Sequence, residues 1–179
     1  TMAIALPSAI MLGALAVLKP GSWADRAVNV ASLSGVSSVD FWLGLMLILI
    51  FSVQLGWLPT SGYGGVQYII LPAVVLAVSP LGRVAQITRS AMLDEMSKPY
   101  IRAARAKGMS RRQAIFRHGL KNAFVPIITM AGDETTSVLN GAVVIEAVFA
   151  WPGVGLLLIQ AIQRRELPLI ESTVLVIAV

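Results

Sequence analysis

Long apolar stretches, separated by shorter polar ones, dominate the chain. Three such stretches lie before the middle of the sequence, at about residues 1–18, 41–57 and 66–82. Apolar residues resume at about 123–148 and again over residues 169–179. A helix needs about 20 mainly apolar residues to cross a bilayer. The pattern therefore predicts about five membrane-spanning helices, the last of them unfinished.

These spans predict an all-α integral membrane protein, folded as a polytopic helical bundle. We expect residues 1–179 to belong to a single transmembrane domain. The sequence opens inside one apolar stretch and stops inside another. We therefore expect the domain to be incomplete at both ends.

Composition supports the membrane assignment. Hydrophobic residues make up 56% of the chain and charged residues 13%, and the mean hydropathy is +0.79. An ordinary soluble domain carries about 25% charged residues. The chain has no cysteine, which excludes disulfides, thiolate chemistry and cysteine-ligated metals.

The positive charge is confined to one stretch. Residues 83–121 hold ten of the fourteen Lys and Arg residues but only two acidic residues, Asp94 and Glu95, a net charge of +8. The rest of the chain has four basic and seven acidic residues, a net charge of −3. Cytoplasmic loops of membrane proteins are enriched in Lys and Arg, so we expect the basic stretch on the cytoplasmic side. Alternation then places the loop at 19–26 on the same side, and those at 58–65 and 146–171 outside.

Residues 97–121 carry their own helix signals. Ser97 or Lys98 is suited to cap a helix that has a proline in the favoured first position. Gly108 supplies a left-handed residue at the end of that helix. Ser110 is followed three residues later by Gln113, the spacing of a capping box. The segment is therefore predicted to form a helix, a short turn and a second helix that continues into the membrane.

Three interpretations of this segment compete on these grounds. It is a solvated basic loop against anionic lipid, a membrane-tethered nucleic-acid reader of the helix-turn-helix type, or a docking element for a peripheral protein. The nucleic-acid interpretation is disfavoured because both ends run directly into apolar spans without a linker. Composition alone does not separate the other two.

The stretch PYIRAARAKGMSRRQAIFRHGLKNAFVPII resembles the signature loop of membrane subunits of ABC importers. The branch it resembles carries dipeptides, oligopeptides, glutathione and nickel. Arg102-Ala103-Ala104 matches the Glu-Ala-Ala triplet of the family, and Gly108 and Leu120 match its later positions. Arg102 replaces the Glu, and Lys121 replaces a Pro, as in the peptide branch. LKPGSWADRAVNV, FWLGLMLILIFSVQLGWLPTSG and GAVVIEAVFAWPGVGLLLIQAI also resemble that branch, in the same order.

The resemblance implies a permease subunit in the cytoplasmic (inner) membrane of a prokaryote. It also implies a second permease subunit, two cytoplasmic ATP-binding subunits and an extracytoplasmic substrate-binding protein, with the lipid bilayer around the spans and no nucleic acid. The residues that it assigns to ATPase coupling are Arg102, Ala103, Ala104, Gly108, Ser110 and Leu120. They all lie within residues 97–121, which we therefore call the coupling segment. No phosphate-binding motif of the Gly-x-x-x-x-Gly-Lys-Ser/Thr type occurs in the sequence, so ATP hydrolysis is expected on partner chains and no cofactor is expected here.

Asp133 and Glu134 interrupt the fourth apolar stretch. Acidic residues at that depth are costly and suggest either a transport pathway or a paired charge. One interpretation is an ion pair with another span, or a broken helix that brings the acids near an interface. Another is a substrate path in which one acid meets a cationic group, such as a peptide amino terminus. A third makes them the ion-coupling groups of a channel or gradient-driven secondary transporter, the main rival of the importer.

Catalytic and metal chemistry find little support in the sequence. His118 is the only histidine, and no cysteine or acidic cluster stands near it at the spacing of metal ligands. A structural or docking role for His118 is favoured over metal binding or catalysis. No nucleophile motif or suitably spaced carboxylate pair is present, which disfavours a membrane-embedded enzyme.

Overall fold

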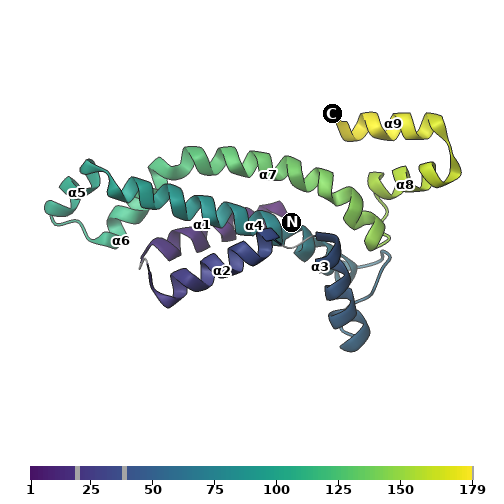
Figure 1. The fold of residues 1–179 in the computed structure, drawn as a ribbon, viewed down its shortest axis with the longest axis horizontal. Helices are drawn as coiled ribbons and strands as arrows, with labels where there is room; N and C mark the ends of the chain where they lie inside the picture. Colours follow the sequence, from purple (N-terminus) through teal and green to yellow (C-terminus); the bar gives the residue numbers. More distant parts are fainter. Residues whose placement is uncertain (19–20, 38–39, 179) are drawn as a thin grey trace. The chain divides into compact units, whose positions relative to one another are not determined.

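The computed structural model describes residues 1–18, 21–37 and 40–178, and these residues form helices and connecting turns without a strand. This confirms the all-α class (Figure 1). Lys19, Pro20 and the last residue of the fifth predicted span lie outside the described part. In chain order the helices are α1 (Met2–Leu18), α2 (Trp23–Ser37), α3 (Asp40–Leu47), η1 (Ile48–Gln54), α4 (Val66–Ser97), α5 (Pro99–Ala106), α6 (Arg111–Ala114), η2 (Ile115–Gly119), α7 (Leu120–Val148), α8 (Val154–Arg164) and α9 (Leu167–Ala178). The two η elements are π-helical segments.

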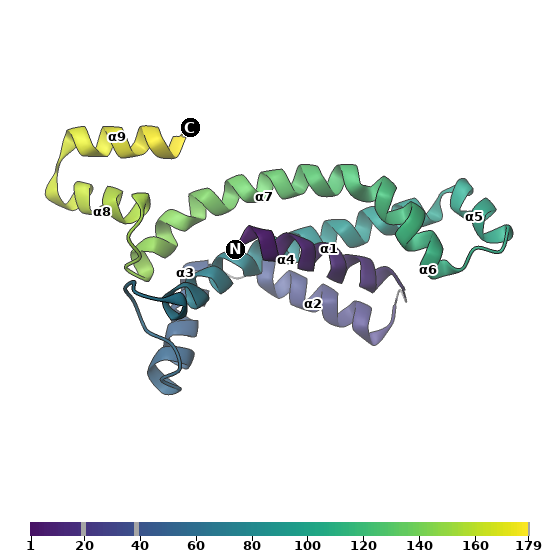
Figure 2. The same cartoon turned by 180° about the vertical axis from the view of Figure 1, so that it is seen from behind.

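The chain forms two compact units, of which the first comprises Thr1–Ser37 and Val78–Thr135. In this unit α1 and α2 lie alongside the second half of α4, as Figures 1 and 2 both show. A Cβ atom added to Gly13 of α1 would lie 2.6 Å from the Ala85 carbonyl oxygen of α4, so these backbones approach closely. The core of the unit consists of buried side chains of α1, α4, η2 and α7, namely Ala9, Ala14, Val17, Val84, Ala85, Met92, Ile115, Ala123 and Ile127.

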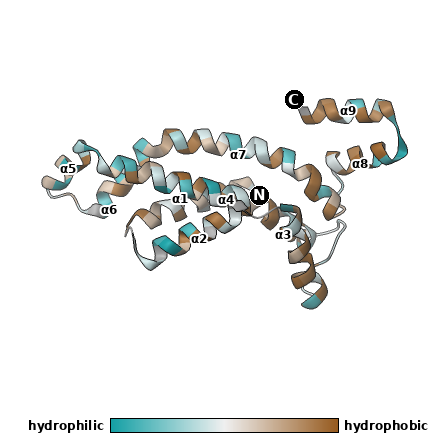
Figure 3. Ribbon diagram, in the orientation of Figure 1, coloured by the Kyte–Doolittle hydropathy of each residue, from teal (hydrophilic) through white to brown (hydrophobic). Residues whose placement is uncertain are grey.

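The second unit comprises residues 38–77 and 136–179. Its core contains Leu71 and Val75 of α4 together with Ile145 of α7 and Phe149, which follows that helix. The Gly62 amide donates a hydrogen bond of 3.0 Å to the Phe149 carbonyl oxygen, so the turn before α4 is tied to the end of α7. Figure 3 shows that α3 and α9 are mostly hydrophobic.

Helix α4 is longer than the sequence predicted. It begins at Val66, as expected, but it passes Gly82 and continues to Ser97, for 32 residues in all. No proline occurs between positions 81 and 98, and the arginines in this stretch are held in ion pairs with other helices. The expectation that the apolar span ends near residue 82 is therefore wrong for the helix, because the change from apolar to basic residues does not interrupt the backbone.

Helix α2 was not predicted. The sequence indicated a loop at 19–26 and no helix before the second span, whereas α2 begins at Trp23. Its sequence is too polar to form a long apolar stretch, so the hydrophobic pattern does not indicate this helix. Ser22 nevertheless accepts a hydrogen bond of 3.3 Å from the Asp25 amide, as a helix-capping serine does. This three-residue spacing was the available signal in the sequence.

Most ends of the remaining predicted spans lie close to the ends of helices in the structure. The predicted span at 41–57 becomes α3 followed by η1, which ends at Gln54. The span at 123–148 corresponds to α7, which begins three residues earlier, at Leu120, and ends at Val148 as expected. Among the described residues, Val66–Ser97 is the one helix that is by itself long and apolar enough to cross a membrane. Asp25–Gly35 and Asp40–Gln54 would make a second if they form one broken span.

Candidate functional site

The coupling segment starts at a sharp corner between α4 and α5. Lys98 stands between the two helices with an extended backbone (φ −67°, ψ 149°), and Pro99 occupies the first turn of α5. A proline disfavours helical backbone at the residue before it, which explains why α4 stops here. The two predicted capping candidates thus have separate roles: Lys98 is the N-cap of α5, and the Ser97 hydroxyl donates to the Asp94 carbonyl oxygen at 2.7 Å.

A polar network braces this corner. The Tyr100 hydroxyl donates to Glu95 Oε2 at 2.6 Å and accepts from Asn122 Nδ2 at 2.7 Å, so α5 is linked to both α4 and α7. Lys98 also forms an ion pair with Glu95, and the hydrogen bond between these two side chains raises the pKa of Lys98. Burial, with the hydrogen bond to Glu95, raises the pKa of Tyr100. The hydroxyl therefore stays protonated and keeps its role as a donor. No pattern in the sequence predicted this network.

Gly108 ends α5 as the sequence predicted. Its φ is +91°, a conformation that glycine adopts far more readily than other residues. The Gly108 amide donates to the Arg105 carbonyl oxygen at 3.0 Å, and the Met109 amide donates to that of Ala104 at 3.3 Å. This pair of bonds is the Schellman motif, which satisfies the last carbonyl groups of a helix. No other atom lies within 4 Å of a Cβ added at Gly108, so backbone conformation is what calls for glycine here.

Ser110 and Gln113 form the predicted capping box. The Gln113 amide donates to Ser110 Oγ at 3.3 Å, and the Ser110 amide donates to Gln113 Oε1 at 3.2 Å. The two side chains thus satisfy two amides at the start of α6. From there α6, η2 and α7 follow without a break. The prediction of helix, turn and second helix is confirmed, and both ends of the turn are fixed by specific hydrogen bonds.

One side of the coupling segment is anchored in the first unit. Ile101 of α5, Ala114 and Ile115 are fully buried. Leu120, one of the predicted coupling residues, is half-buried and packs against the core of this unit. Its position therefore suits holding the segment in place more than direct contact with another protein.

The opposite side of the segment is hollowed. A depression of about 550 Å³ lies between the end of α5 and the helix that follows, lined by Ala104, Lys107, Gly108, Met109, Gln113, Phe116 and Arg117. Ala104 and Gly108, two predicted coupling residues, line it together. Ala103 and Ser110 are exposed nearby. Arg102 is also exposed and donates to the Ser97 carbonyl oxygen at 3.1 Å. The depression is open, and its lining combines two basic side chains, Lys107 and Arg117, with the small residues Ala104 and Gly108.

Asp133 and Glu134 have different surroundings on α7. Glu134 is 3% exposed, and its Oε1 lies 3.2 Å from Nε of Arg83 on α4. Arg83 also donates to Ser79 Oγ at 2.6 Å. Asp133 is exposed in this chain. The ion pair between spans, one of the alternatives for these acids, is thus present for Glu134, whereas a role of either residue in a substrate path stays a prediction.

Two further polar residues have structural surroundings. Glu146 accepts a hydrogen bond of 2.7 Å from the Gly155 amide and one of 3.4 Å from the Leu156 amide, so it caps the start of α8. His118 is half-buried in η2. In the described ranges no three His, Cys, Asp or Glu side chains gather in a way that would hold a metal ion.

These features define a class: a helical protein of the membrane with a basic, rigid helix-turn-helix that emerges from its longest helix. The family model for the binding-protein-dependent transport system inner membrane component matches residues 9–179. The chain belongs to this family and is therefore a multi-pass inner-membrane protein.

Two named relatives are similar to this chain over most of its length. The chain is 40% identical over 197 residues to the di/tripeptide transport system permease protein DppB of Pseudomonas aeruginosa (strain UCBPP-PA14), an alignment covering 94% of this chain and 59% of that protein. It is 40% identical over 163 residues to the glutathione transport system permease protein GsiC of Escherichia coli (strain K12), covering 91% of this chain and 53% of that protein. The chain thus spans somewhat more than half the length of these relatives. The resemblance seen in the sequence is confirmed.

Proposed function

We propose that residues 1–179 belong to the single membrane domain of a permease subunit in a binding-protein-dependent ABC importer. The solute would be a short peptide, glutathione or a related small solute such as nickel. The family membership and the names of the relatives support this class. In this proposal the chain forms part of the translocation path, and ATP is hydrolysed on other subunits.

The coupling segment carries the proposal. Its exposed face would fit a groove on a cytoplasmic ATP-binding subunit, with Ala103, Ala104 and Gly108 allowing close approach and Arg102 and Ser110 at the edge. The Schellman motif at Gly108 and the capping box after it hold the two helices in a fixed relation. A segment built in this way transmits a displacement better than a solvated loop would. This is the reason to prefer docking over simple attraction to anionic lipid.

The proposed assembly has two permease subunits, two ATP-binding subunits and an outer substrate-binding protein, with lipid around the spans. Closure of the ATP-binding subunits would move both coupling segments and switch the path between inward-facing and outward-facing states. The net charge of +8 over residues 83–121 supports a cytoplasmic position for the segment.

Asp133 is the residue that we propose for the substrate path. An exposed acid within a membrane-spanning helix is costly against lipid and is better placed against water, a partner or a substrate. Glu134 is neutralised by Arg83, so we assign it to helix packing. The rival function, a gradient-driven transporter, would need these acids to exchange ions, and the pairing of Glu134 leaves only Asp133 for that task.

Uptake by the reconstituted importer tests the proposal. The full-length permease, its partner permease and the ATP-binding subunits would be placed in lipid vesicles, and a radiolabelled dipeptide supplied outside. We expect uptake to require ATP inside the vesicles and the binding protein outside, and to continue when proton and sodium gradients are collapsed. Uptake that follows an ion gradient and ignores ATP would support the secondary transporter instead.

A further inference from the structure

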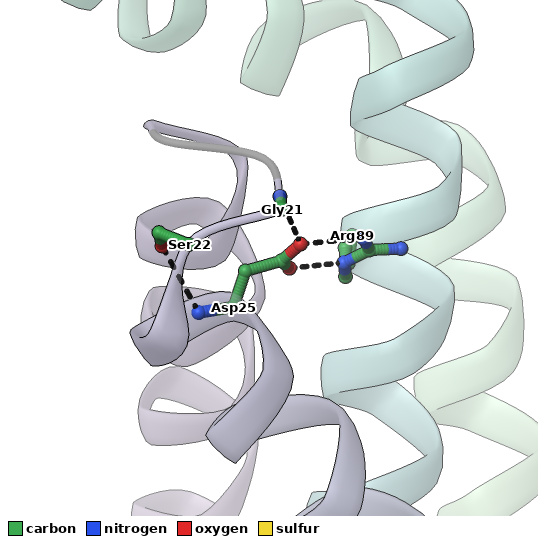
Figure 4. A network of polar contacts seen from close by, with 4 residues as sticks. All are labelled: Gly21, Ser22, Asp25 and Arg89. Carbon is green, nitrogen blue, oxygen red and sulfur yellow. Dashed lines mark hydrogen bonds and ion pairs between the residues drawn. The ribbon is translucent and has the colours of Figure 1, made fainter.

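Asp25 and Arg89 form a two-point ion pair between α2 and α4 (Figure 4). Arg89 Nε donates to Asp25 Oδ1 at 2.6 Å, and Arg89 Nη2 donates to Asp25 Oδ2 at 2.9 Å. Asp25 is 2% exposed. Two parallel bonds between a guanidinium and a carboxylate fix the orientation of both groups as well as their distance.

Asp25 also holds the two residues directly before α2. Its Oδ2 accepts a hydrogen bond of 2.9 Å from the Gly21 amide, and its own amide donates to Ser22 Oγ at 3.3 Å. The same carboxylate therefore holds the turn before α2 and the arginine of α4. While the ion pair is intact, a displacement of α4 at Arg89 also moves Asp25 and the residues before α2.

Arg89 lies on the part of α4 that leads directly to the coupling segment. The helix continues from Arg89 to Ser97 without interruption, about 12 Å along the axis at 1.5 Å per residue. Lys98 then forms the corner, and α5 begins at Pro99. The ion pair is thus joined to the coupling segment by a short, continuous length of helix.

Two glycine contacts between α4 and α2 are of a different kind. A Cβ added to Gly82 would lie 2.6 Å from the Ser32 carbonyl oxygen, and one added to Gly35 would lie 3.1 Å from that of Val78. These glycine contacts bring the helix backbones close together. Small sliding movements of packed helices are a common mode of conformational change. The ion pair adds a restraint along the axis, because its two bonds fix Arg89 against Asp25.

We propose that Asp25 and Arg89 are positioning residues that make α2 move with the coupling segment. The proposal rests on the function proposed above, because it requires ATP-binding subunits to move the coupling segment. It assigns a task to two residues outside that segment: they carry its displacement from α4 to α2 and the turn before it. Without the pair, α4 would slide past α2 along the glycine contacts.

Spin-label distances in the assembled transporter test this directly. Residues 1–179 contain no cysteine. The labels would be placed at Trp23→Cys at the start of α2 and Ser97→Cys at the end of α4, with any cysteine elsewhere in the assembled transporter replaced by serine; Trp23 is 85% exposed. Distances would be measured in lipid vesicles without nucleotide and with Mg-ATP and vanadate. With the pair intact, we expect the same distance in both states. With Arg89→Gln, we expect the distance to shift between the two states while the ATP-binding subunits remain bound.

Two variants complete the design. Arg26→Gln, which removes an exposed charge beside Asp25, is the matched control and should behave as the intact protein. Arg89→Lys keeps the charge but loses the two-point contact with the carboxylate, so it should give an intermediate shift. A distance that stays constant in both Arg89→Gln and Arg89→Lys would overturn the proposal. Failure of the unsubstituted permease to retain ATP-binding subunits would instead overturn the proposed function, and the inference with it.

Discussion

The carboxylate of Glu146 fills the space next to Gly153 so closely that a Cβ atom on Gly153 would collide with it. Gly153 has an extended backbone (φ −148°, ψ −180°), which any residue can adopt, so glycine is required here by space. Glu146 uses this position to accept hydrogen bonds from two amides at the start of α8. A carboxylate near a helix N-terminus is also favoured by the helix dipole.

We predict that Gly153→Ala destabilises the protein by about 1 kcal/mol, because the added methyl group would displace the carboxylate at the flexible end of Glu146 and weaken the hydrogen bonds that it accepts. Thermal unfolding of the purified permease in detergent would report the loss. Gly65→Ala is the matched control, because no other atom lies within 4 Å of a Cβ at that position, and its effect should be small.

A double substitution identifies the cause. In the background of Glu146→Ala the added methyl group meets no carboxylate, so Gly153→Ala should cost clearly less than it does alone. Equal costs in the two backgrounds would show that Gly153 is not needed to make room for Glu146.

The two adjacent acids of α7 should separate into a stability role and a transport role. Glu134→Gln removes the charge that pairs with Arg83 in a buried setting, and we predict a loss of about 1–3 kcal/mol in the free energy of unfolding. Asp133→Asn should leave unfolding unchanged within about 0.5 kcal/mol and should alter the rate or the preference of peptide uptake. Unchanged uptake in Asp133→Asn would count against a place in the substrate path.

A third prediction concerns the close packing of α1 on α4. A Cβ on Gly13 would lie 2.6 Å from the Ala85 carbonyl oxygen and 2.7 Å from Thr88 Cβ, so Gly13→Ala should push the two helices apart and cost about 1–3 kcal/mol. Gly119→Ala provides the comparison, because its nearest neighbour would be Met96 Sδ at an ordinary 3.5 Å. Equal melting temperatures of these two variants would contradict the packing described here.

The local structure of the coupling segment could be predicted because its signals are local. Pro99, Gly108, Ser110 and Gln113 act on backbone groups within a few residues of themselves, and each has the conformation or hydrogen bond that its position in the sequence indicates. Backbone capping depends on spacing along the chain, which the sequence displays directly.

The tertiary ion pairs could not be predicted in the same way. Asp25 and Arg89 are 64 residues apart, and Arg83 and Glu134 are 51 apart. A charge in the sequence looks the same whether it meets water or a buried partner. For this reason the sequence did not distinguish Arg83 and Arg89 from the other basic residues of the stretch, whereas these two lie within α4 and pair with acids of neighbouring helices. Helix α2 was missed because its buried face carries polar groups, Asp25 and Ser32 among them.

The central claim is that the coupling segment docks an ATP-binding subunit, and two positions in the segment test it. Gly108→Val places a β-branched residue at a φ of +91°, whereas Gly108→Asn supplies a residue that tolerates positive φ better. Ala104→Asp puts a charge into the depression beside it, whereas Ala104→Ser is nearly isosteric. The backbone strain that Gly108→Val introduces costs about 1–3 kcal/mol.

The most direct measurement is the amount of ATP-binding subunit that co-purifies with the full-length permease carrying each substitution. We predict that Gly108→Val and Ala104→Asp lower the affinity about 5- to 30-fold, as one or two kcal/mol would, and that Gly108→Asn and Ala104→Ser retain most of it. Undiminished co-purification and transport in Gly108→Val and Ala104→Asp would contradict the claim.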